Sequence, residues 1–198
     1  MNAYKNFDGP QHIMNIKERA MEVGFTASCD DLTSHLLRTL IASKQQSNIL
    51  ELGTGVGYST AWILDGMDKD SKLTTVELNE EFASIAKEYL GHDQRVNFVI
   101  QDGEEFIKDH IDYKYDFIFA DTWPGKFNHI EEVLGMVKPG GIYLIDDLNL
   151  QANWPEGHSD KVIELITYLE SRGDFYMSKL DCSTGLIIMT SKNIQRYI

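Results

Sequence analysis

Residues 48–59 constrain the fold of this chain more than any other stretch of its sequence. The stretch opens with a short apolar run at 49–52, which is typical of a buried strand. Glycines follow at alternate positions, Gly53, Gly55 and Gly57, and a helix-like run comes directly after them. Because glycine tolerates positive φ and close approach, a strand, a glycine turn and a helix can bring backbone amides up to a ligand.

Predicted strands and helices alternate from this point along the chain. The pattern predicts strands at 48–52, 72–77, 96–100, 115–120 and 142–145. Helices are predicted between and after them, at about 58–67, after Asn79, after Asp102, near 127–137 and from about His158 to Leu169. Two further strands, 175–180 and 185–190, are separated by only four residues and therefore predict an antiparallel hairpin. We therefore expect a doubly wound, Rossmann-like α/β sheet of seven strands, five in parallel units and two in the hairpin.

Two helices are predicted before the first strand. The first runs over about 10–23, and the second carries leucines at helical spacing from Leu32 onward, with Asp30 or Asp31 as its cap. We expect a single domain over residues 1–198, with an N-terminal helical cap at 1–46 and an α/β core at 47–198.

The charge and the N-terminus bear on partners and location. The formal net charge of -13 disfavours general nucleic-acid binding, since an acidic surface repels phosphates. The N-terminus has no apolar signal segment, and no apolar run approaches the roughly 20 residues that span a bilayer. We therefore expect a cytoplasmic protein whose partner is a small molecule, with no membrane association.

The residues around the glycine turn indicate which ligand it holds. The spacing is G-x-G-x-G, which departs from the G-x-G-x-x-G of dinucleotide sites. Glu51, inside the end of the first strand, would oppose a pyrophosphate and favour a ligand that carries a cation. S-adenosylmethionine has an ammonium, a sulfonium, a ribose and an adenine. We expect Glu51 near its cationic end, Glu77 on the ribose, and Asp102 with Gly103 near the adenine.

The same residues resemble a known family. Glu51-Leu52-Gly53-Thr54-Gly55-Val56-Gly57-Tyr58-Ser59 resembles motif I of class I methyltransferases, and its Tyr-Ser ending is similar to small O-methyltransferases of the catechol and caffeoyl-CoA type. Residues 75–79, 115–121 and 138–141 resemble further motifs of that family in order. The resemblance covers roughly residues 30–190 and implies S-adenosylmethionine and methyl transfer. The cofactor-binding residues that follow are Glu51, Gly53, Thr54, Gly55, Gly57, Tyr58, Ser59, Glu77, Asp102, Gly103 and Asp121.

The resemblance also implies Mg²⁺, held by an Asp after the fourth strand and an Asp-Asn pair after the fifth. Asp121 and Asp147 match this pattern, but Leu148 stands where Asn is expected and Asn149 comes one position later. The family lysine after the fourth strand is displaced as well, with Pro124 in its place. The expected metal ligands are Asp121, Asp147 and Asn149, and a reaction without a metal remains open.

Without a metal, another group must take the proton of the methyl acceptor. His158, in the polar loop after the fifth strand, is a candidate because a histidine titrates near neutral pH. The catalytic candidates are therefore Asp121, Asp147 and His158. Trp123 and Trp154 are candidates for the walls of an acceptor pocket.

The leading hypothesis is an S-adenosylmethionine-dependent O-methyltransferase that acts on a small hydroxylated molecule. The alternatives are a metal-independent methyltransferase of another acceptor, including a tRNA-modifying relative, and a non-catalytic S-adenosylmethionine-binding protein. A nicotinamide dehydrogenase is a further alternative. The resemblance is also compatible with a homodimer through the N-terminal helices.

Overall fold

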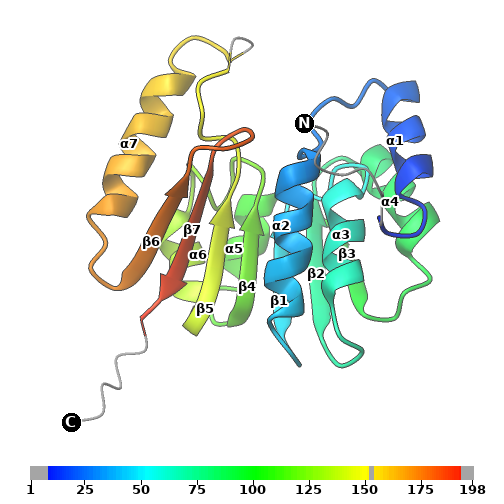
Figure 1. The fold of residues 1–198 in the computed structure, drawn as a ribbon, viewed down its shortest axis with the longest axis horizontal. Coiled ribbons are helices and arrows are strands. Elements are labelled where there is room, and N and C mark those ends of the chain that lie inside the picture. Colours follow the sequence, from blue (N-terminus) through cyan, green and yellow to red (C-terminus); the bar gives the residue numbers. More distant parts are fainter. Residues whose placement is uncertain (1–8, 152–153, 193–198) are drawn as a thin grey trace.

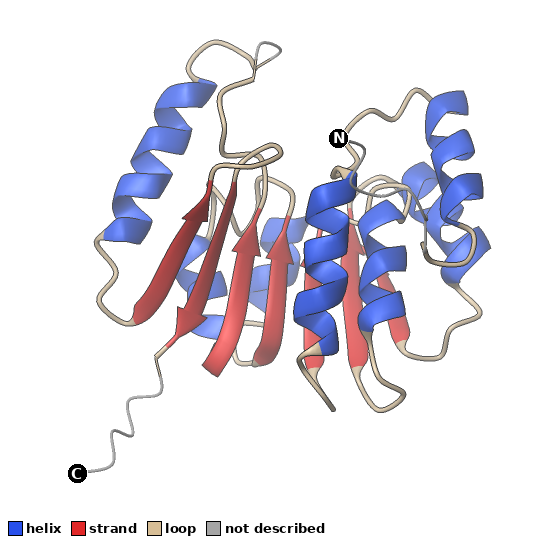
Figure 2. Cartoon of the chain, viewed as in Figure 1, coloured by secondary structure: helices blue, strands red, loops and turns tan. Residues whose placement is uncertain are grey.

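A seven-stranded sheet lies between two layers of helices in the computed structural model, which describes residues 9–151 and 154–192 (Figures 1 and 2). The strand order is β3-β2-β1-β4-β5-β7-β6, in which β1 to β5 are parallel and β7 runs antiparallel to both of its neighbours. The predicted fold class is thereby confirmed. The strands are β1 Asn48–Leu52, β2 Lys72–Glu77, β3 Val96–Ile100, β4 Tyr115–Ala120, β5 Val137–Ile145, β6 Phe175–Leu180 and β7 Leu186–Ser191.

One strand departs from the prediction at its start. The sequence analysis placed a turn at 138–141 and began the fifth strand at 142, whereas β5 begins at Val137. The pairing of β5 with β4 shifts register between Tyr115 and Phe117, which is a bulge-like irregularity. Proline and glycine are tolerated in a strand at such a point, because the hydrogen-bond ladder is already interrupted there.

The helices lie close to their predicted positions, and their caps confirm three of the predicted start signals. The side chains of Asp30, Asn79 and Asp102 each accept a hydrogen bond from the backbone at the start of α2, α4 and α5. The helices are α1 Ile13–Glu22, α2 Asp31–Ala42, α3 Tyr58–Gly66, α4 Glu80–Leu90, α5 Gly103–Asp109, α6 Ile130–Met136 and α7 His158–Glu170.

Two hydrophobic clusters fill the space on the two faces of the sheet. Helices α1 to α4 pack over one face, where Ile49 of β1 and Phe117 of β4 are buried. Helices α5, α6 and α7 pack over the other face, where Leu50 and Leu52 are buried. Because side chains alternate along a strand, Glu51 lies on the same face as Ile49, beneath the start of α3. The helices therefore cover both faces of the sheet, and the two remaining edges are those at which the parallel strands begin and end.

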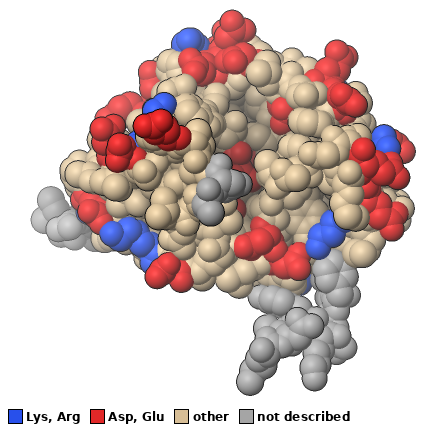
Figure 3. Space-filling model, turned by 90° about the horizontal axis from the view of Figure 1, so that it is seen from above, with Lys and Arg blue, Asp and Glu red and all other residues tan. Residues whose placement is uncertain are grey.

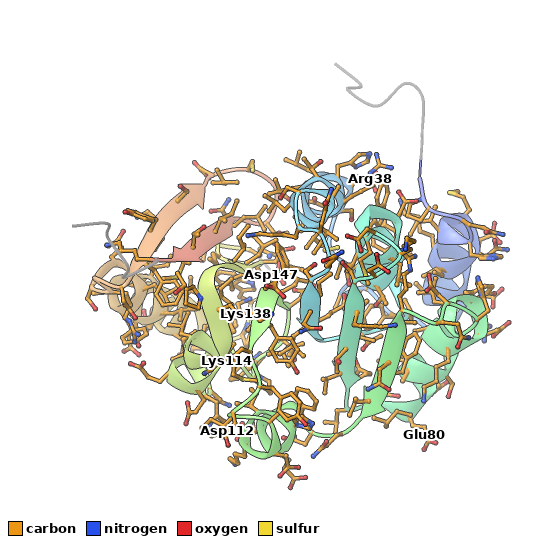
Figure 4. The ribbon with its side chains drawn as sticks, turned by 90° about the horizontal axis from the view of Figure 1, so that it is seen from below. Arg38, Glu80, Asp112, Lys114, Lys138 and Asp147 are labelled. Carbon is orange, nitrogen blue, oxygen red and sulfur yellow. The ribbon has the colours of Figure 1, made fainter. Side chains whose placement is uncertain are left out.

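The two edges of the sheet differ in what they carry. The amino-terminal edge, seen from below in Figure 4, carries Lys114 and Lys138, and Lys138 pairs with Asp116 at 2.7 Å. The carboxyl-terminal edge, seen from above in Figure 3, is hollowed and has more acidic than basic side chains around it. Ligands of open parallel sheets bind at the carboxyl-terminal edge.

Within residues 9–151 and 154–192, every helix is too short or too polar to cross a membrane. The single-domain boundaries, the cytoplasmic location and the homodimer stay predictions.

Candidate functional site

The glycine turn after β1 is held against its two neighbouring strands. The backbone amides of Gly53 and Thr54 donate to the carbonyl of Val76, at 3.0 and 3.1 Å. Gly53 has a φ of 99°, and a Cβ at this position would lie 2.9 Å from the carbonyl oxygen of Asp121. Only glycine fits here, because an L side chain meets both an unfavourable φ and backbone that cannot move aside.

The glutamate of the motif lies underneath this turn. Glu51 is completely buried, and its carboxylate accepts hydrogen bonds from the hydroxyls of Ser59 at 2.5 Å, Thr60 at 2.6 Å and Thr75 at 2.6 Å. Burial raises the pKa of Glu51 to about 7, and the three hydroxyl donors act against this shift. Glu51 does not line any of the cavities described below, so it can affect a ligand only through its field or by fixing the turn.

The acid at the end of β2 reaches the turn directly. The amide of Gly55 donates to Glu77 Oε2 at 2.8 Å, and the amide of Asn79 donates to Glu77 Oε1 at 2.9 Å. The carboxylate is therefore held in one place by two backbone amides while its remaining lone pairs face the cavities beside it.

Two cavities meet at Glu77, each of about 210 Å³. Cavity one lies over β2 and β3 and is lined by Glu77, Asp102, Gly103 and Thr122 among others. Cavity two lies over the glycine turn and is lined by the predicted residues Gly53, Thr54, Gly55, Tyr58, Ser59, Glu77 and Asp121. Gly57 lines neither cavity, because it is the N-cap of α3, with a φ of 92°, and packs against Ala86.

A third cavity continues from cavity two past Asp121. Cavity three, of about 320 Å³, lies beyond the ends of β4 and β5. It is lined by residues that include Asp121, Trp123, Lys126, Phe127, Asp147, Trp154 and His158. Cavity three is therefore lined by both aromatic rings and charged groups. It adjoins cavity two, because Asp121 and residues 27–29 line both cavities.

Three carboxylates follow β4 and β5 at this edge. Burial, together with Asp146 and Asp147, raises the pKa of Asp121 well above its usual range. Burial also raises the pKa of Asp146 to about 6, although the Thr184 hydroxyl and the Asp147 amide donate to its side chain. The carboxylates lie near a buried lysine, Lys126, whose side chain is only 4% exposed.

His158, the predicted base, is the first residue of α7 and lies among three aromatic rings. Its ring centroid is 4.6 Å from that of Trp154, 5.2 Å from that of Phe127 and 5.7 Å from that of Trp123. Among the described residues, its buried Nδ1 has no hydrogen-bond partner. Burial, with Lys126 and Lys161 nearby, lowers the pKa of His158, which keeps the imidazole neutral at neutral pH.

Two of the three predicted metal ligands, Asp121 and Asp147, line cavity three together, whereas Asn149 does not line it. The metal site itself stays a prediction. The amide nitrogen of Asn149 donates to Asp181 at 3.1 Å, and its backbone packs on Gly185. Asp147 has a φ of 59° and accepts a hydrogen bond from Gln151 at 2.9 Å. The one-residue displacement thus turns Asn149 toward the β6–β7 turn. In the described part of the chain, no group of three or more His, Cys, Asp or Glu residues is arranged to hold a metal ion.

Several residues of the site were missed by the sequence analysis. Thr60 and Thr75 bond to Glu51 from another helix and another strand, and no local pattern marks them. The segment from Phe25 to Cys29, between α1 and α2, lines cavity two and carries no motif. The sequence did point to Lys126, because the family resemblance implies a lysine at the position of Pro124, just before it.

Comparison with known proteins places the chain among methyltransferases. The family model described as O-methyltransferase matches residues 14–168. A Mycobacterium avium protein, whose name provisionally assigns it to the O-methyltransferases, is 28% identical over 134 residues, 65% of this chain and 60% of that protein. Catechol O-methyltransferase B of Danio rerio is 28% identical over 147 residues, 69% of this chain and 53% of that protein. The chain therefore spans less than two thirds of the length of these relatives.

Solved structures share the fold. The O-methyltransferase from Bacillus cereus in complex with SAH has a TM-score of 0.83 at 18% identity, over 95% of this chain and 94% of that chain. The O-methyltransferase TomG from Streptomyces achromogenes, in complex with SAM, has a TM-score of 0.81 at 20% identity, over 92% of this chain and 90% of that chain.

Proposed function

The chain belongs to the O-methyltransferase family, and on this premise we propose that it transfers a methyl group from S-adenosylmethionine to an oxygen of a small molecule. The observation that carries the proposal is the position of Glu77. Its carboxylate is fixed by the amides of Gly55 and Asn79 at the junction of cavities one and two. A carboxylate with free lone pairs at this point suits the two hydroxyls of a ribose.

The flanking cavities suit the two ends of the same cofactor. Cavity one, with Asp102 and Gly103, would hold the adenine, and cavity two, over the glycine turn, would hold the amino-acid end. Glu51, buried beneath the turn, would favour the cation there through its field rather than by contact. When bound, S-adenosylmethionine supplies a methyl carbon whose bond to sulfur breaks with the electron pair remaining on sulfur.

Cavity three would hold the acceptor. Trp123, Phe127 and Trp154 lie around His158 and line this cavity with it, and such aromatic walls suit a small molecule with a planar ring. The neutral imidazole of His158 would accept the proton of the acceptor hydroxyl, and the electron pair left on oxygen forms the new bond to carbon. Small molecules are the proposed partners, because the net charge of -13 disfavours a nucleic-acid acceptor.

Replacing Glu77 with alanine is expected to weaken binding of S-adenosylhomocysteine by about tenfold or more. The reason is the loss of hydrogen bonds to a charged acceptor, each worth about 1.5–3 kcal/mol, where 1.4 kcal/mol corresponds to tenfold. Isothermal titration calorimetry measures the affinity, and a thermal melt confirms that the variant is folded. Glu88→Ala, on the exposed surface of α4, is the control and should bind as the wild type does. Wild-type protein that is folded but does not bind S-adenosylhomocysteine would refute the proposed function.

A further inference from the structure

The acceptor cavity contains a buried cation of its own. Lys126 is 4% exposed and lines cavity three together with Asp121, Asp147 and His158. Among the described residues, its side chain takes part in no ion pair or hydrogen bond, and its Nζ lies 5.5 Å from the centre of the Phe127 ring. Burial of an ammonium is costly, and the nearby carboxylates of Asp121, Asp146 and Asp147 offset part of that cost. A ligand oxygen in the cavity would give the ammonium a direct hydrogen-bond partner.

The surrounding charges favour the charged form of this lysine. Burial is the larger effect and lowers the pKa of Lys126 on balance, while Asp121, Asp147 and Asp146 oppose this shift and favour the ammonium. Among the described residues, the His158 Nδ1 is buried without a hydrogen-bond partner, and its side chain lines the same cavity as Lys126. A ligand that fills this cavity can provide what both side chains lack.

The carboxylates and the lysine occupy the place where the family resemblance implies a metal. Asn149 is turned away toward Asp181, while Lys126 is introduced among Asp121, Asp146 and Asp147. A divalent cation at Asp121 and Asp147 would lack the amide ligand that the family pattern supplies, since Asn149 donates to Asp181 instead.

We propose that the ammonium of Lys126 replaces a divalent metal as the cation that binds the acceptor oxygen. This inference rests on the proposed function. The acceptor hydroxyl gives its proton to His158, and the resulting oxyanion pairs with Lys126, which stays protonated throughout. Once the oxygen is methylated it is neutral and no longer pairs with the ammonium, which favours release of the product. A single charge of this kind binds one oxygen, so the acceptor does not need the two adjacent hydroxyls that chelate a metal.

The test uses the full chain saturated with S-adenosylhomocysteine, and 4-nitrophenol as a probe whose phenolate form has its own visible spectrum. In the presence of EDTA, the wild type is expected to bind the phenolate, and Lys126→Met is expected to lose at least tenfold in phenolate affinity. Both should bind S-adenosylhomocysteine equally, which shows that the fold and the cofactor site are intact. Lys87→Met is the matched control, since Lys87 is an exposed lysine of α4 that lines none of the three cavities.

A second measurement addresses the metal directly. Titration of the wild type with Mn²⁺, followed by electron paramagnetic resonance, is expected to show no stoichiometric binding. Phenolate binding by Lys126→Met should be the same with and without EDTA. Stoichiometric Mn²⁺ binding by the wild type, or phenolate binding only after Mn²⁺ is added, would overturn the inference. So would a wild type that binds S-adenosylhomocysteine but no phenolate. Failure to bind S-adenosylhomocysteine would instead count against the proposed function.

Discussion

Replacing Gly53 with alanine is expected to lower the free energy of unfolding by at least about 2 kcal/mol and to abolish binding of S-adenosylhomocysteine. At its φ of 99°, an L residue is strained, and the new Cβ would lie 2.9 Å from the carbonyl oxygen of Asp121. The two nearest atoms are backbone atoms of Asp121, whose amide donates to the carbonyl of Leu52 at 3.0 Å, so they cannot move aside without disturbing the pairing of β1 with β4. The turn would shift away from Val76, and the amides that line cavity two would shift with it.

Chemical denaturation and calorimetry measure the two effects, and Gly135→Ala is the matched control. A Cβ at Gly135 meets no atom within 4 Å, and this glycine lies inside α6. Alanine there is expected to raise the stability by about 0.5–1 kcal/mol, because glycine in a helix loses more backbone entropy on folding. A Gly53→Ala variant with the stability and the cofactor affinity of the wild type would show that the turn is not held as described.

The stability of the wild type is expected to fall by about 3 kcal/mol, relative to that of Glu51→Gln, between about pH 5 and pH 8. The pKa of Glu51 is raised from 4.5 to about 7 by burial. Between these values the folded protein keeps a proton that the unfolded chain has lost. The stabilisation is therefore complete below pH 4.5, is lost as the pH rises to about 7, and does not change further above that. Glutamine does not titrate, so the variant lacks this contribution.

Urea denaturation at a series of pH values measures the difference between the two proteins. Asp146, whose pKa is also raised, remains in both proteins. Glu51 is the smallest of the named causes that raise the pKa of Asp121, so the difference reports Glu51 together with this smaller effect on Asp121. The control is Glu80→Gln, an exposed side chain at the start of α4, whose pH profile should run parallel to that of the wild type (Figure 4). Parallel profiles for Glu51→Gln and the wild type would contradict the described burial of Glu51.

Local sequence patterns were enough to predict most of the fold. The apolar runs of β1 to β4 have the predicted bounds, because each is a short buried strand with clear polar or glycine boundaries. The caps at Asp30, Asn79 and Asp102 act through their own neighbouring amides, so the sequence contains their whole signal. The start of β5 was missed because Val137 pairs with Tyr115, while Pro139 and its neighbouring glycines lie in the irregular stretch before Ile142 pairs with Phe117. Pairing of this kind depends on a partner that is distant in sequence.

The sequence predicted those parts of the candidate site whose role depends on the conformation of the backbone. Gly53 and Gly55 could be assigned because positive φ and close approach leave glycine as the residue that fits. The sequence could not tell that Glu51 faces the interior, since its hydroxyl partners come from α3 and β2. Nor could it place Asn149, whose direction depends on contacts with the β6–β7 turn.

The sequence by itself determined the strand–glycine turn–helix unit, the order of strands and helices, and the acids at the strand ends, because each is encoded by residues adjacent along the chain. Only the tertiary structure decided which of these acids meet a ligand and which are enclosed. It also placed Lys126 among Asp121, Asp146 and Asp147, and His158 among three aromatic rings. The physical reason is that burial and charge are set by neighbours from other elements, and those neighbours meet only when the sheet is assembled.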